Sequence, residues 1–190
     1  MQQSNFDSFA DDWWNKDGSM KLLHSMNETR MLFILERILN RYSNYNEIKD
    51  IFKKKKILDL GCGGGILAES LAKRGGNVTG FDISKKLIKI AQESAKKKNL
   101  HIDYNVGNLK KIISMKKKYD IIISLEVIEH VPNYILFLKS IFKILNKNGI
   151  IIISTINRNF ISYFFTIFIA ENLLKLVPKG THDWNYYVKP

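Results

Sequence analysis

The stretch that decides the fold is Lys56-Ile57-Leu58-Asp59-Leu60-Gly61-Cys62-Gly63-Gly64-Gly65. Its apolar first half is short and closed by glycines, which is typical of a strand buried in a parallel sheet. The glycines let the backbone turn tightly and approach a ligand closely, because no Cβ stands in the way. We therefore predict a ligand-binding loop directly after a central strand.

Strand-like and helix-like segments alternate from this stretch to residue 155. Helices are predicted at 66–73, 84–99 and 132–148, and further strands at 77–82, 101–106, 119–125 and 149–155. This alternation is typical of a parallel sheet with right-handed crossovers. The sequence therefore predicts an α/β fold with a doubly wound, mostly parallel sheet of the Rossmann-like type.

The N-terminal part, residues 1–50, is predicted to be a cap segment followed by a helix. The aromatic-rich stretch 6–24 cannot form a core alone, so we expect it to pack over the domain. Apolar residues from Met31 to Leu39 recur with helical spacing, and Asn27 is the predicted N-cap of this helix.

Two further segments complete the predicted domain organisation. Residues 51–156 form the cofactor-binding α/β core, and residues 157–190 form a hydrophobic insertion with a substrate-side loop. Five strands can be placed, which is two fewer than this fold usually has. We therefore expect the core to be incomplete after Pro190, with the remaining strands lost or supplied by a partner.

The composition indicates a globular protein of a reducing compartment. Apolar residues make up 45% of the chain and charged residues 25%, close to globular averages. The single cysteine, Cys62, excludes an internal disulfide framework. Residues 1–12 lack the basic start and apolar run of a secretory signal. We therefore expect a cytoplasmic location.

The net charge of +12, from 30 Lys plus Arg against 18 Asp plus Glu, leaves several interpretations open. A basic surface suits nucleic acid or the anionic face of a membrane. Lysine runs such as 53–56 and 96–98 are also typical of solvated strand and helix edges.

Two aspartates give the glycine loop its predicted ligand. The loop fails the dinucleotide fingerprint because Ile66 occupies the last glycine position. An acidic residue two before the first glycine, Asp59, suits the cationic end of S-adenosylmethionine (SAM), although it could also cap loop amides. Asp82 follows Gly61 by 21 positions, near the spacing of a ribose-hydroxyl acceptor.

A second cluster, Glu126, Glu129 and His130, follows the strand at 119–125. At these spacings the three side chains would share one face of a turn. They suit a divalent metal site that holds a phenolate, or a general base, Glu129 or His130, that removes a phenol proton. A purely structural role for the turn is the alternative. The Asn/Asp-Pro-Pro-aromatic run of nucleic-acid N-methyltransferases is absent here.

The stretch Phe160 to Ala170 is uninterrupted apolar sequence. It is too short for a bilayer-spanning helix, which needs ~20 residues. It suits a buried helix or dimer face, or a segment that enters a membrane interface beside Arg158, Lys175 and Lys179.

Taken together, these residues resemble the ubiquinone biosynthesis O-methyltransferase family nearly end to end. The most specific parts of the match are a Trp-Trp pair, the Glu-x-x-Glu-His turn and a Pro-Lys-Gly-Thr-His-Asp run; they stand at Trp13-Trp14, at Glu126 to His130 and at Pro178 to Asp183. The resemblance implies SAM-dependent methylation of the phenolic hydroxyls of polyprenylated precursors, 2-polyprenyl-6-hydroxyphenol and 3-demethylubiquinol.

The resemblance also implies roles for particular residues. SAM contacts fall on Arg30, Gly61, Asp82 and Leu125, in addition to Asp59 and Gly63 of the loop itself. A divalent ion, Mg²⁺ or Zn²⁺, falls on Glu126, Glu129 and His130; the histidine leaves its identity open, because magnesium prefers oxygen ligands.

The resemblance implies partners and a location as well. The partners are a polyprenyl phenol or quinol, an anionic membrane surface and other ubiquinone-biosynthesis proteins, but not nucleic acid. The location implied is peripheral on the inner membrane. Two alternatives stay open: a truncated, non-catalytic protein of the SAM fold that binds membrane or a partner, and a methyltransferase for another small phenol.

Overall fold

The computed structural model describes residues 5–155, and these form one parallel sheet flanked by helices. The strand order is β3-β2-β1-β4-β5, and every neighbouring pair is parallel. The strands are β1 (Lys56–Leu60), β2 (Asn77–Asp82), β3 (Asp103–Val106), β4 (Tyr119–Leu125) and β5 (Leu145–Ser154). The α/β prediction is confirmed. The order reverses at β1 and β4, where open α/β sheets bind their ligands.

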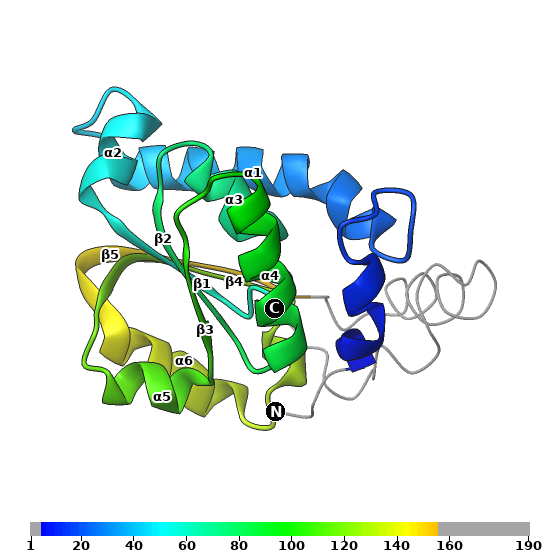
Figure 1. Cartoon of the computed structure of the whole chain (residues 1–190). Helices are drawn as coiled ribbons and strands as arrows, with labels where there is room; N and C mark the ends of the chain where they lie inside the picture. Colours follow the sequence, from blue (N-terminus) through cyan, green and yellow to red (C-terminus); the bar gives the residue numbers. More distant parts are fainter. Residues whose placement is uncertain (1–4, 156–190) are drawn as a thin grey trace, which may run out of the picture.

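Helices cover both faces of this sheet (Figure 1). They are α1 (Lys21–Arg41), α2 (Ile48–Lys54), α3 (Ile66–Ala72), α4 (Lys85–Lys97), α5 (Leu109–Ser114) and α6 (Tyr134–Ile144), with 3₁₀ turns η1 (Asn5–Asp12) and η2 (Ile128–His130). In the view of Figure 1, α1 and α3 lie above the sheet and α5 and α6 below it. The buried clusters place α2 and α4 on the same face as α1 and α3.

Successive side chains of the central strands pack alternately into two separate hydrophobic cores, one on each face of the sheet. Ile57 of β1 packs under α1, α3 and α4, whereas its neighbour Leu58 packs under α5 and α6. Ile121 and Ile122 of β4 divide in the same way. All four side chains are fully buried. This is why the strands read as continuous apolar runs rather than as alternating ones.

Some predicted boundaries are wrong. Asn27 is not an N-cap, because α1 begins six residues earlier, at Lys21; inside the helix, the Asn27 amide donates to Ser70 Oγ over 2.8 Å. The extra turn is held by tertiary packing, since Leu23 contacts the aromatic cluster of the N-terminal segment. β3 begins at Asp103 instead of residue 101.

The helix predicted at 132–148 is also shorter than expected. Asn133, not Pro132, begins α6: its side chain accepts a hydrogen bond from the N–H of Leu136. The helix ends at Ile144, and Asn148, with a φ of 66°, lies in an irregular part of β5. The short helices α2 and α5 were not predicted, because six or seven residues show too little periodicity.

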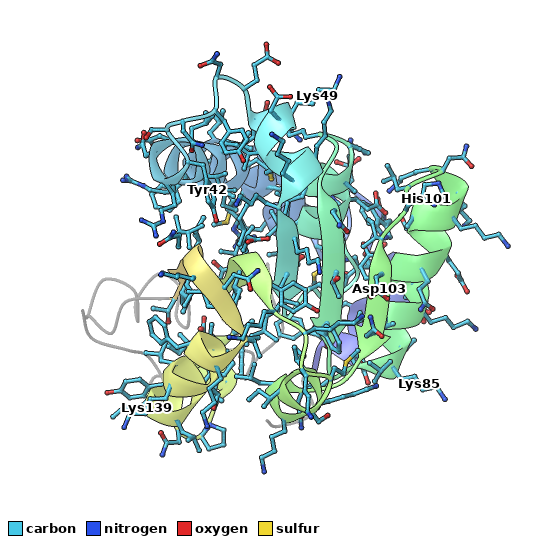
Figure 2. All side chains as sticks on the ribbon, turned by 90° about the vertical axis from the view of Figure 1, so that its left-hand side faces the viewer. Tyr42, Lys49, Lys85, His101, Asp103 and Lys139 are labelled. Carbon is cyan, nitrogen blue, oxygen red and sulfur yellow. The ribbon has the colours of Figure 1, made fainter. Side chains whose placement is uncertain are left out.

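The basic side chains spread over the surface. Figure 2 shows Lys49, Lys85 and Lys139 projecting outward from α2, α4 and α6. None of the helices between residues 5 and 155 combines the length and apolar character that crossing a bilayer requires. The predicted insertion at 157–190, with its apolar stretch, lies outside the described residues.

Candidate active site

A cavity of about 180 Å³ opens at the carboxyl ends of β1, β2 and β4. Its lining joins the glycine loop to the N-terminal segment, to α1 and to the turn after β4. The lining residues include Phe6, Trp13, Arg30, Asp59, Gly61, Gly63, Asp82, Asn108, Leu125, Glu126 and His130. Every predicted cofactor-binding residue is therefore on its wall. Of the three predicted metal ligands, Glu126 and His130 are on the wall as well.

The glycine loop needs its glycines for two reasons. Gly61, Gly63 and Gly65 have φ values of 82°, 52° and 90°, which side chains rarely adopt. Space is the second reason: a Cβ on Gly61 would lie 2.2 Å from Val127 Cγ2. The N–H of Gly61 donates to the Phe81 carbonyl over 2.7 Å, which ties the loop to β2.

Asp82 organises the loop from the end of β2. One carboxylate oxygen accepts from the N–H of Gly63 at 2.9 Å and the other from the N–H of Ser84 at 2.8 Å. Burial raises the pKa of Asp82, while these backbone hydrogen bonds act in the opposite direction. Ser84 also caps α4, as predicted, by accepting from the N–H of Leu87.

Asp59 is a buried acid on the cavity wall. It is 3% exposed, and its Oδ2 has no hydrogen-bond partner among residues 5–155. Burial, reinforced by the negative charge of Asp82, raises the pKa of Asp59 to about 7, although the N–H of Ala68 favours the anion. A bound cation beside this oxygen would compensate the buried charge.

Arg30 and Glu126 form an ion pair at the edge of the cavity. Arg30 comes from α1, and Glu126 follows β4 with a φ of 51°. The other oxygen of Glu126 accepts from Ser154 Oγ at 2.6 Å. A left-handed backbone is unusual for a glutamate and is typical of functional turns.

Glu126, Glu129 and His130 differ in what surrounds them, and their shared role stays a prediction. His130 lines the cavity, where the Phe6 ring meets it edge-on at 6.1 Å between centroids. Glu129 is 4% exposed, is not part of the cavity wall among the described residues, and accepts from Thr155 Oγ1 at 3.3 Å. Glu129 and His130 both belong to the 3₁₀ turn η2.

The divalent ion that the resemblance implies at these positions stays a prediction. Between residues 5 and 155, no three His, Cys, Asp or Glu side chains come close enough to hold an ion. Glu126 pairs with Arg30, and Glu129 accepts a hydrogen bond from Thr155.

The sequence reasoning missed several residues of the cavity wall. Phe6 and Trp13 reach it from the N-terminal segment, and Asn108 reaches it from the loop after β3. A Cβ on Gly64 would lie 2.4 Å from the indole of Trp13, so this ring lies directly on the glycine loop. The aromatic density of residues 6–14 indicated a cap but not which ring would enter the site.

Comparisons with known proteins agree with this geometry. A family model described as a methyltransferase domain matches residues 26–190. The chain is 43% identical over 185 residues to the ubiquinone biosynthesis O-methyltransferase of Pelagibacter ubique (strain HTCC1062), covering 97% of this chain and 76% of that protein. The protein of the same name from Rickettsia prowazekii (strain Madrid E) is also 43% identical, with 97% and 70% covered.

A solved structure extends the likeness to the fold. Coclaurine N-methyltransferase, bound to N-methylheliamine and S-adenosylhomocysteine, matches with a TM-score of 0.52 and 26% identity, over 64% of this chain and 34% of that one. Fold, cavity and comparisons define a SAM-dependent methyltransferase with the class I fold. Within that class, the chain belongs to the ubiquinone biosynthesis O-methyltransferase family.

Proposed function

We propose that this chain transfers the methyl group of SAM to phenolic hydroxyls of polyprenylated ubiquinone precursors. The observation that carries the proposal is one cavity in which Asp59, Asp82 and the glycine loop face the Glu126–His130 turn. The family relatives carry the matching activity in their names. The substrates are the two phenols that the sequence resemblance implies.

SAM fits the polar groups of the cavity wall. Asp82 suits the ribose hydroxyls, because a carboxylate oxygen has acceptor capacity beyond one backbone hydrogen bond. Asp59 suits the cationic amino group or sulfonium. Arg30 suits the carboxylate of the cofactor. On binding SAM, Arg30 would release the carboxylate of Glu126 and pair with that of the cofactor instead. Half-buried Leu125 offers an apolar neighbour for the adenine.

The transfer itself needs a proton acceptor beside the methyl donor. His130 is the better candidate base, since it lines the cavity and Glu129 does not. The imidazole takes the phenol proton, the phenolate oxygen forms a bond to the methyl carbon, the sulfur–methyl bond breaks, and S-adenosylhomocysteine leaves. Alignment supplies much of the acceleration. Glu129, hydrogen-bonded to Thr155, supports the turn from behind.

A lipid-soluble substrate makes a membrane location part of the proposal. The apolar stretch 160–170 and its basic neighbours suit an anionic membrane interface, as does the net charge of +12. We propose peripheral binding to the inner membrane from the cytoplasm, beside other ubiquinone-biosynthesis proteins. Liposome flotation tests this: changing Phe164 and Phe165 to serine should weaken flotation on anionic vesicles, and unimpaired flotation would contradict it.

Incubation with methyl-labelled SAM tests the activity. The purified chain should label both a polyprenyl catechol and a demethylated quinol. Labelling of short, soluble phenols alone would favour a methyltransferase for another small phenol. A folded sample that binds SAM but labels no phenol would contradict the proposal in favour of a non-catalytic protein of this fold.

A further inference from the structure

The N-terminal cap, residues 5–20, forms part of the cofactor cavity. Its Phe6 and Trp13 line that cavity, and the Trp13 indole lies on Gly63 and Gly64. Ala10, Trp13 and Met20 are buried in a small cluster against α4. Figure 1 shows η1, in dark blue, beside α4 and away from the central strands. The cap therefore contributes two aromatic rings to the wall of the proposed cofactor site.

The next residue, Trp14, contacts a lysine that does not line the cavity. The ammonium of Lys98 stands 3.3 Å from the centroid of the Trp14 ring. Lys98 is the C-cap residue that follows α4, and it is not among the described residues of the cavity wall. A cation over an indole face is attracted by the ring quadrupole, most strongly when both groups are shielded from water.

Lys98 is itself fixed by two partners. Its ammonium donates to Glu69 Oε2 over 2.7 Å and to Ser94 Oγ over 2.8 Å. The Glu69 side chain is 1% exposed and belongs to α3, the helix that the glycine loop begins. The buried carboxylate thus joins α3, the end of α4 and the cap through one ammonium group.

The other charged attachment of the cap is weaker. Lys86 pairs with Asp11 at 3.1 Å, but the Asp11 side chain is 86% exposed. Such exposed pairs contribute little, because water and salt screen them. Ser84 donates to Asp7, and the Trp13 carbonyl lies 2.9 Å from Nε2 of His24. Lys98, by contrast, is tied to the buried carboxylate of Glu69.

We propose that Lys98 is a positioning residue for SAM binding. Held by Glu69, its ammonium fixes Trp14, and Trp14 in turn keeps the adjacent Trp13 on the glycine loop and over the cofactor. The inference rests on the proposed SAM site. It adds a residue that touches neither cofactor nor substrate but controls how tightly the cofactor is retained.

The test is a SAM-binding measurement on matched variants of the full chain. Lys98→Met is combined with Glu69→Gln, because a buried carboxylate without its partner would destabilise the fold. This pair of changes should weaken SAM binding about fivefold by calorimetry, the size expected for a cation–indole contact whose ammonium is partly exposed. Lys98→Arg should stay within about twofold of the wild type, since a guanidinium can stack on the indole and bind the carboxylate.

Two controls separate positioning from general stability. Lys96→Met removes the same charge near the end of α4 and should leave SAM binding unchanged. Trp14→Leu leaves the ion pair intact, should weaken binding to a similar extent, and should add little to the Lys98/Glu69 variant, because both act on one contact. Amide hydrogen exchange in the absence of SAM should become faster in residues 5–20 but not in β1.

The results that would overturn the inference are distinct from those that would overturn the proposed function. A folded Lys98/Glu69 variant with wild-type SAM affinity, no rescue by arginine, or a fully additive effect of Trp14→Leu would each contradict it. If the wild type bound no SAM, the proposed function would fail. Amide hydrogen exchange of residues 5–20 would then still show whether Lys98 holds the cap. If exchange in the Lys98/Glu69 variant were as slow as in the wild type, that result alone would contradict the inference.

Discussion

The backbone N–H of Gly63 donates a 2.9 Å hydrogen bond to Oδ2 of Asp82, so the acid that ends β2 holds the loop that follows β1. The second oxygen of the same carboxylate accepts from Ser84, which caps α4. One side chain therefore sets the glycine loop and the start of a helix at once. This double role makes Asp82 a natural first target for mutation.

Replacing Asp82 by alanine should weaken SAM binding by at least about tenfold, because the ribose loses an acceptor and the Gly63 amide loses its partner. Asp82→Asn keeps one acceptor oxygen and should lie between alanine and the wild type. Calorimetric titration with SAM measures both. Unchanged affinity in the alanine variant would contradict the cofactor assignment.

Asp59 should make SAM binding depend on pH near neutrality. Its folded-state pKa is raised to about 7, chiefly by burial and then by the charge of Asp82. The unliganded site is therefore largely protonated at lower pH, and a bound cation would favour the anion. We expect affinity to rise from about pH 6 to about pH 7.5 with release of a proton.

The matched variant for this prediction is Asp59→Asn, which cannot titrate. It should bind SAM more weakly, with a flatter pH dependence over the same range. The free energy of unfolding changes with pH in the opposite direction. It falls as pH rises from about 4 to about 7, because Asp59 ionises at lower pH in the unfolded chain than in the folded protein. Urea unfolding without SAM should show that loss in the wild type but not in the asparagine variant.

Gly64→Ala tests the contact between the loop and the cap. Gly64 has no positive φ, so alanine meets no backbone strain there; the obstacle is the Trp13 indole, 2.4 Å from the new Cβ. We expect the variant to fold, to displace Trp13 and to bind SAM about tenfold more weakly. In a Trp13→Leu background, Gly64→Ala should reduce SAM affinity much less. An equal loss of SAM affinity in both backgrounds would contradict the contact between Trp13 and the loop.

The two neighbours Glu129 and His130 should respond differently to mutation. His130→Ala should abolish methyl transfer while leaving SAM affinity unchanged, because the imidazole faces the cavity from the turn after β4. Glu129→Gln should also spare SAM binding but should reduce transfer less, since the amide oxygen can still accept from Thr155. Full activity of the His130 variant in a single-turnover assay would refute its role.

Local sequence was sufficient for the strands and for the cofactor loop. β1 and β4 lie where short apolar runs predicted them, since a strand buried on both faces needs no other information than its own composition. The predicted cofactor residues Asp59, Gly61 and Asp82 all line one cavity. Helix beginnings were less predictable: Asn27 resembles an N-cap, but packing of the cap extends α1 past it.

What the sequence determined by itself is the positions of the central strands, the glycine loop and the pair of aspartates, because each of these is marked by residues close together in the chain. Only the tertiary structure decided which side chains from distant parts of the chain come into contact. Arg30 pairs with Glu126 at 96 positions of separation, and Lys98 reaches Trp14 from the far end of α4. Such contacts depend on how whole elements pack, which no local pattern records.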